Sequence, residues 1–255
     1  MKVLSLIIAL VMGALLTVIL DDLPAWGDAQ SPANAHVSAY YLENAYNQTH
    51  VPNVVTAVLA DYRGFDTMFE TGVVFVAVIG IMAILRREGG SKKGVKSRKR
   101  PPHQPPDPAI TGVATRFIVP FMQIFGLYVI AHGHYSPGGG FQGGVILGAS
   151  IILMAMTGEL KSALDRMSED WFIIMVGLGF LIFAGVGLAC MFYGGNFLDY
   201  SALAPLFSGT PQEAAITARY HAMLWVEIGV GFTVMSSMFA IYSYIASDGW
   251  MDRGL

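Results

Sequence analysis

Long apolar stretches separated by polar segments recur along the whole chain. Six of them hold at most one charged residue each, at positions 3–20, 67–85, 117–131, 141–158, 171–193 and 221–246. A helix needs about 20 residues, most of them apolar, to cross the hydrocarbon core of a bilayer. The pattern therefore predicts an all-α integral membrane protein with about six transmembrane helices, two of them N-terminal to a group of four.

Composition points the same way. Only 13% of the 255 residues are charged, about half the share that soluble domains carry, and the mean hydropathy is +0.54. The single cysteine, Cys190, excludes an internal disulfide and a cysteine-based metal cluster. The stretch 3–20 exceeds the roughly 7–15 apolar residues of a signal peptide, so we expect a retained helix.

The basic residues indicate how the helices are oriented. Residues 88–108 hold six Lys and Arg followed by five prolines, a composition typical of a linker. Of the fifteen Lys and Arg, all but Arg63 and Arg219 fall on segments that six alternating spans place on one side. The positive-inside rule therefore predicts that both termini are cytoplasmic. Because topology explains the basic segment, we expect no nucleic-acid partner.

The glycine-rich segment 132–148, HGHYSPGGGFQGGVILG, joins the third apolar stretch to the fourth. Its Ser-Pro-Gly sequence is typical of a tight turn. The glycines at 140, 144 and 148 share one helical face, where another helix backbone can come close. A formal dinucleotide fingerprint at 138–143 lacks the strand that such a site needs. The expected structural positions are His134, Pro137, Gly138, Gly139, Gly140, Gly143, Gly144 and Gly148.

Two predicted spans contain a carboxylate. Glu70 lies in the first turn of 67–85, four residues after Asp66, so both would share a helix face. Thr67 and Glu70 fit a capping box, whereas an acid inside a span is a candidate ion or proton site; both interpretations stay open. Glu227 lies roughly 9 Å into the span 221–246 and is either an ion site or a structural hydrogen-bonding group.

The remaining polar residues suggest no independent chemistry. His132 and His134 cannot point the same way on a helix, and neither has the spacing of a metal motif with His221. Motifs of catalytic triads, haem attachment and iron–sulfur clusters are missing from the sequence. We therefore expect no bound metal, no cofactor and no enzyme activity.

Two segments resemble known families. Residues 134–144, HYSPGGGFQGG, resemble the signature of the MnhB-like family, whose members are the B-type subunits of Mrp-type multisubunit Na⁺/H⁺ antiporters and the matching subunits of membrane-bound hydrogenases. Residues 62–70, YRGFDTMFE, resemble the C-terminal end of the A-type Mrp subunit, which stands alone as the small E-type subunit of those hydrogenases. The resemblances imply a two-helix module at 1–87, a cytoplasmic linker at 88–108 and an MnhB-like four-helix domain at 109–255.

The resemblance also implies a function. It predicts a non-catalytic subunit of a Na⁺/H⁺ antiporter in the cell inner membrane, with large proton-channel subunits, small membrane subunits and lipid as partners. Asp66 and Glu70 match an acidic pair thought to help sodium pass, and we assign Glu227 to the same cation and proton pathway. The alternatives are a structural spacer between larger subunits and a membrane-arm component of a hydrogenase-type redox complex.

Overall fold

The computed structural model describes residues 2–86, 108–158, 164 and 167–247. The regular structure in these ranges is entirely helical, and six helices are long and apolar enough to cross a membrane. This confirms the predicted all-α membrane fold. The chain divides into two compact units, residues 1–44 and 45–255, and each is described by itself.

The first unit contains one candidate span and a short helical segment. Helix α1, Lys2–Asp21, has no buried residue in its apolar window, and its large side chains are all exposed. The rest of this unit therefore covers none of the apolar surface of α1. A π-helix, η1 (Ala33–Ser38), leads into α2 (Ala39–Thr49), whose last turn belongs to the second unit.

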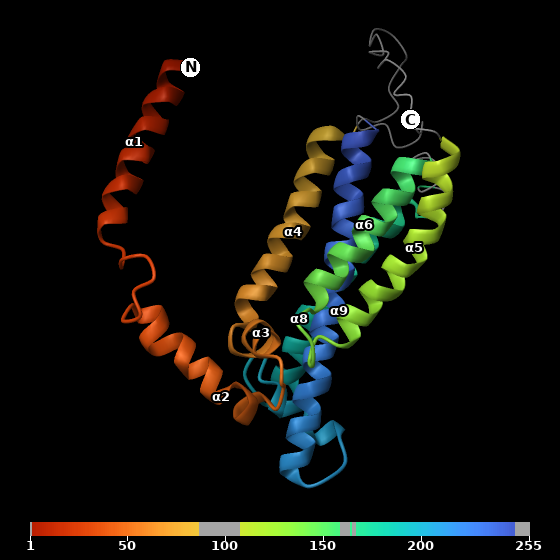
Figure 1. The fold of residues 1–255 in the computed structure, drawn as a ribbon. Coiled ribbons are helices and arrows are strands. Elements are labelled where there is room, and N and C mark those ends of the chain that lie inside the picture. The colour runs from red at the N-terminus through yellow and green to blue at the C-terminus, as the bar shows by residue number, and fades with distance from the viewer. Residues whose placement is uncertain (1, 87–107, 159–163, 165–166, 248–255) are drawn as a thin grey trace. The chain divides into compact units, whose positions relative to one another are not determined.

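The second unit is a bundle built around one long helix (Figure 1). Helix α9, Pro211–Ala246, packs against α8, α6, η3 and α4, and 67% of its apolar window is buried. The other elements are α3 (Val54–Thr56), the π-helix η2 (Ala57–Tyr62), α4 (Gly64–Leu85), α5 (Pro108–Ala131), α6 (Gly140–Gly158), α8 (Glu169–Phe192) and the 3₁₀ helix η3 (Tyr200–Leu206).

Two helices begin well before the predicted residues. Helix α9 begins ten residues before position 221, because Thr210 and Glu213 form a capping box and Pro211 follows the cap. Glu227 therefore lies about 24 Å along the helix rather than 9 Å. Helix α5 begins at Pro108, a residue that composition assigns to the linker; the linker residues 88–107 lie outside the described part of the chain.

Side-chain contacts identify the two ends of the bundle. At one end, Arg86 Nε lies 3.4 Å from Glu169 Oε1, and the Tyr244 hydroxyl donates to the same oxygen at 2.5 Å. These contacts join the end of α4, the start of α8 and the end of α9. The bend between α5 and α6, together with α3 and η3, lies at the opposite end (Figure 1).

Candidate functional site

The glycine face of α6 lies against α9. A Cβ atom on Gly140 would overlap the Glu227 main chain, and one on Gly144 would come within 2.8 Å of the Gly231 carbonyl oxygen. Gly148 approaches the Met235 carbonyl in the same way, at 3.1 Å. Because no side chains separate the two backbones, α6 and the bend before it are held directly on the turn of α9 that carries Glu227.

The bend also encloses the Glu227 carboxyl group. The Glu227 residue is only 7% exposed. A Cβ atom on Gly133 would lie 2.5 Å from Glu227 Oε2, and one on Gly139 would lie 2.9 Å from Oε1. A side chain at either position would therefore displace the Glu227 carboxyl group.

A short segment from the N-terminal half of the chain holds the bend in place. The Thr56 hydroxyl donates to the Gly133 carbonyl at 2.6 Å and lies 3.3 Å from Glu227 Oε1. The Asn53 side-chain amide donates to the carbonyls of Gly133 and Ser136, both at 2.7 Å. Sequence reasoning missed Asn53 and Thr56, because nothing in their local pattern shows that residues about 80 positions away are their partners.

His134 faces Glu227 from the bend. Its side chain is fully buried, its Nε2 lies 3.1 Å from the Tyr220 carbonyl oxygen, and its Nδ1 lies 4.0 Å from Glu227 Oε2. Burial lowers the pKa of His134, although the Tyr220 carbonyl opposes this shift. Neither His134 Nδ1 nor Glu227 Oε2 has a hydrogen-bond partner in the described structure.

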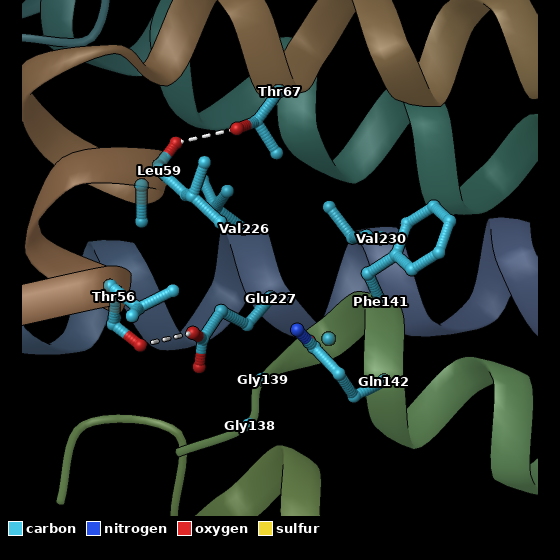
Figure 2. A pocket seen from close by; sticks show the side chains of 13 residues that line it. Thr56, Leu59, Thr67, Gly138, Gly139, Phe141, Gln142, Val226, Glu227 and Val230 are labelled. Carbon is cyan, nitrogen blue, oxygen red and sulfur yellow. Dashed lines mark hydrogen bonds between the residues drawn. The ribbon is translucent and has the colours of Figure 1, made fainter. Parts of the chain in front are cut away.

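A small cavity lies beside the Glu227 carboxyl group. Its volume is about 40 Å³, above the roughly 10–15 Å³ that a cavity needs to hold a water molecule. Figure 2 shows Thr56 and Glu227 on one side of this space, with Gln142 and the glycines of the bend opposite. The rest of the lining is mostly apolar, and Glu227 is the one ionisable group among the described residues that form it.

Asp66 and Glu70 lie in a different environment. They line an open groove on α4 together with Arg63, Phe69 and Phe141, and the Asp66 side chain is 49% exposed and paired with Arg63. The structure does not bring them together with Glu227, although Phe141 borders both the groove and the small cavity. The capping-box interpretation is wrong: α4 begins at Gly64, and the Thr67 hydroxyl donates to the Leu59 carbonyl at 2.7 Å.

A second ion pair lies on the same side of the bundle. Arg219 Nη1 is 3.2 Å from Asp61 Oδ2 and donates to the Gln48 carbonyl at 2.9 Å. Burial raises the pKa of Asp61, and the Arg219 charge opposes this shift. This ion pair therefore links η2 to α9, which Thr56 also contacts through Glu227. The described residues contain no group of three or more His, Cys, Asp or Glu side chains placed to hold a metal ion.

Fold and site define a multi-pass helical membrane protein whose central span carries an enclosed carboxyl group. Family models narrow this class. The model described as "Domain related to MnhB subunit of Na+/H+ antiporter" matches residues 110–240, and the model MbhE, described as the E-type subunit of MBH, matches residues 2–101. The chain belongs to the MnhB family, as its glycine-rich signature indicated.

Individual relatives agree with this assignment. The chain is 28% identical to a probable K⁺/H⁺ antiporter A/B subunit of Rhizobium meliloti over 210 residues, which are 72% of this chain and 20% of the relative. It is 32% identical to the putative antiporter subunit mnhB2 of Staphylococcus aureus strain Newman over 127 residues, 49% of this chain and 89% of the relative. The chain thus spans only a fifth of the Rhizobium protein.

Two solved structures share the fold. A chain of the Mrp complex from Dietzia sp. DQ12-45-1b superposes with a TM-score of 0.63 at 26% identity, covering 99% of this chain and 26% of that one. A chain of the membrane-bound sulfane sulfur reductase, an archaeal respiratory membrane complex, superposes with a TM-score of 0.62 at 27% identity, covering 96% and 97%. The fusion of both modules in one polypeptide is therefore not peculiar to this protein.

Proposed function

We propose that this chain is a membrane subunit of a multisubunit cation/proton antiporter and lines part of the ion route. Its family and its antiporter-subunit relatives support this role. The subunit lies in the cell membrane with both termini cytoplasmic, contacts large proton-channel subunits and small membrane subunits, and catalyses no reaction of its own. The exchanged ions are Na⁺ and H⁺.

The enclosed Glu227 carboxyl group carries this proposal. Burying an ionisable group inside a span is costly, and an apolar residue would serve packing alone at lower cost. Here the buried carboxyl group borders a cavity large enough for water, and the glycine bend around it has no room for side chains. Such an arrangement suits a carboxyl group that binds and releases an ion during transport.

Asp66 and Glu70 extend the proposed route. Their groove is open, whereas the cavity at Glu227 is small, and Phe141 lies at the border of both. We assign the groove to the cation, because two carboxylates one helical turn apart supply the oxygen ligands that hard cations prefer. Movement of Phe141 would then connect the groove to the cavity.

The test compares neutral variants in the complete complex. Asp66→Asn, Glu70→Gln and Glu227→Gln each preserve side-chain size and are expected to reduce Na⁺/H⁺ antiport in everted membrane vesicles to background, with the complex still assembled. Glu213→Gln is the matched control, since Glu213 is exposed on the same helix as Glu227 and Gln also completes a capping box. Full antiport in all three variants would reject the proposed ion route through this chain and favour the structural spacer role.

One observation favours a second candidate, a component of the membrane arm of a redox complex. The sulfane sulfur reductase chain matches this protein almost end to end. Spectroscopy of the purified native complex distinguishes the two candidate functions. Iron–sulfur signals in electron paramagnetic resonance spectra of the complex would favour the redox arm, and their absence from an antiport-active complex would exclude it.

A further inference from the structure

The hydrogen bond at Nε2 determines which nitrogen of His134 carries the proton. Nε2 faces the Tyr220 carbonyl oxygen, which can only accept. Nε2 must therefore carry the hydrogen, and in the neutral ring Nδ1 presents a lone pair. That lone pair faces Glu227 Oε2 across 4.0 Å, and neither atom has another partner in the described structure.

We propose that His134 and Glu227 form a proton-binding pair that holds one proton between Nδ1 and Oε2. This inference rests on the proposed function and names the ion that binds at Glu227. In one state the carboxyl group is protonated and the imidazole neutral; in the other the same proton has moved to Nδ1, which leaves a carboxylate and an imidazolium. The net charge of the pair is zero in both of these states, which limits the cost of burying it.

The geometry requires only a small rearrangement for the transfer. A direct hydrogen bond needs about 3 Å between the two heavy atoms, so the side chains must approach by roughly 1 Å, or one water must bridge them. The cavity beside Glu227 has room for a water molecule, but His134 is not among its lining residues, so the direct approach of the two side chains is the route that we propose. Exposed neighbours in the bend, His132 and Tyr135, place His134 close to the surface at this end of the bundle.

The same surroundings disfavour sodium at Glu227. Hard cations prefer several oxygen ligands, whereas Oε2 faces a ring nitrogen. The Gly133 carbonyl already accepts hydrogen bonds from Thr56 and Asn53. Much of the remaining cavity lining is aliphatic. A proton needs no such ligand shell, so the pair binds protons while the open groove at Asp66 and Glu70 receives the cation.

Other titratable groups set the electrostatic field of the pair. The pKa of His134 is lowered mainly by burial, and the nearby His221 lowers it further. The ring of Tyr220 packs on the imidazole with centroids 4.3 Å apart, and the Tyr135 ring lies 6.3 Å from the Tyr220 ring. Among the described residues, Tyr200 of η3 also interacts electrostatically with Glu227 and with the Asp61–Arg219 ion pair.

The experiment uses the complete antiporter complex in proteoliposomes with three variants, Glu227→Gln, His134→Gln and the control His132→Gln. Gln at 134 can still donate to the Tyr220 carbonyl but cannot accept and hold a proton. We expect His134→Gln to lower the maximal rate and to change the pH profile of antiport, with the apparent KM for Na⁺ unchanged. His132→Gln, at an exposed position of the same bend, should behave like the wild type.

Infrared spectroscopy provides an independent measurement. A protonated-carboxyl band that disappears in Glu227→Gln should shift in frequency in His134→Gln and stay in place in His132→Gln. If His134→Gln does not assemble, wild-type complex with isotope-labelled histidine answers the same question. Its imidazole bands and the Glu227 carboxyl band must then change at the same pH.

Three results would overturn the proton pair. The first is a raised KM for Na⁺ in His134→Gln with an unchanged pH profile, which would make the site a cation site. The second is a carboxyl band that does not shift in His134→Gln. The third is a set of imidazole bands that changes at a different pH from the carboxyl band. If Glu227→Gln is inactive while His134→Gln transports like the wild type, only the proton pair is rejected. If Glu227→Gln is active, the role of Glu227 in transport is rejected as well.

Discussion

Two acidic regions of this protein look alike in sequence but differ in structure. Glu227 and Glu70 are each the one carboxylate of an apolar stretch. Glu227 is enclosed by Gly133, Gly139 and Thr56, which come from two distant segments of the same chain. Glu70 lies with Asp66 in an open groove on α4, and the one ion pair described there joins Asp66 to Arg63.

The Glu227 site is thus formed entirely by this chain, whereas the groove at Asp66 and Glu70 is an open surface. The enclosed site requires tight backbone packing, so changes around it should alter folding and transport together. The open groove lies on a helix with only 11% of its apolar window buried, next to exposed Phe69 and Val73. Changes there should leave this chain folded and affect only what the complete complex does.

The strongest disruption is expected from Gly140→Leu. A side chain at this position must overlap the Glu227 main chain, which cannot move without moving α9. Overpacking costs about 1–3 kcal/mol when side chains can yield, and more when backbone is struck. We expect little assembled complex and a clearly lowered melting temperature for what remains, measured by thermal unfolding in detergent.

Gly185→Leu is the matched control for this variant. It introduces the same side chain into a span, but a Cβ atom on Gly185 would meet nothing within 4 Å. Equal losses in both variants would mean that leucine is harmful in any span of this bundle, and the close approach of α6 to α9 would not explain the effect.

A smaller effect is expected from Thr56→Val. This change keeps the shape of the side chain and removes the hydroxyl group that donates to the Gly133 carbonyl. The variant also loses the contact with Glu227 Oε1 and the hydrogen bond from the Asn53 side-chain amide. A buried hydrogen bond contributes about 1–2 kcal/mol, and the loss at Gly133 is moderated because Asn53 still donates to the same carbonyl. Thermal unfolding of Thr157→Val provides the comparison, since the Thr157 hydroxyl is at an exposed position and donates to the Leu153 carbonyl of its own helix in the described part of the chain. A destabilisation equal in the two variants would contradict the role of Thr56 in holding the bend.

The smallest effect on stability is expected when Asp66→Asn and Glu70→Gln are combined. The double variant removes one exposed ion pair, which is worth about 0–1 kcal/mol. The melting temperature should therefore match the wild type, while antiport in vesicles falls to background. A clear loss of stability would show that the groove is part of the folded core, and the contrast with Glu227 would disappear.

Local signals predicted the helices but not every boundary. Hydropathy located all six spans, because a lipid-facing helix must be apolar whatever its neighbours are. The same measure placed the start of α9 too late, since its first turns are polar and begin at the Thr210 capping box. The capping-box motif at Thr67 was misleading, because the chain before it is already helical from Gly64.

The sequence by itself determined the membrane class, the tight bend, the glycine face of α6 and the family, because each follows from composition or from spacing within about twenty residues. Only the tertiary structure decided that this face meets α9 at Glu227, that His134 faces the same carboxyl group, and that Asn53 and Thr56 hold the bend. These contacts join residues about 80 to 170 positions apart. Their partners are selected by how the helices pack, and no local pattern of residues records that choice.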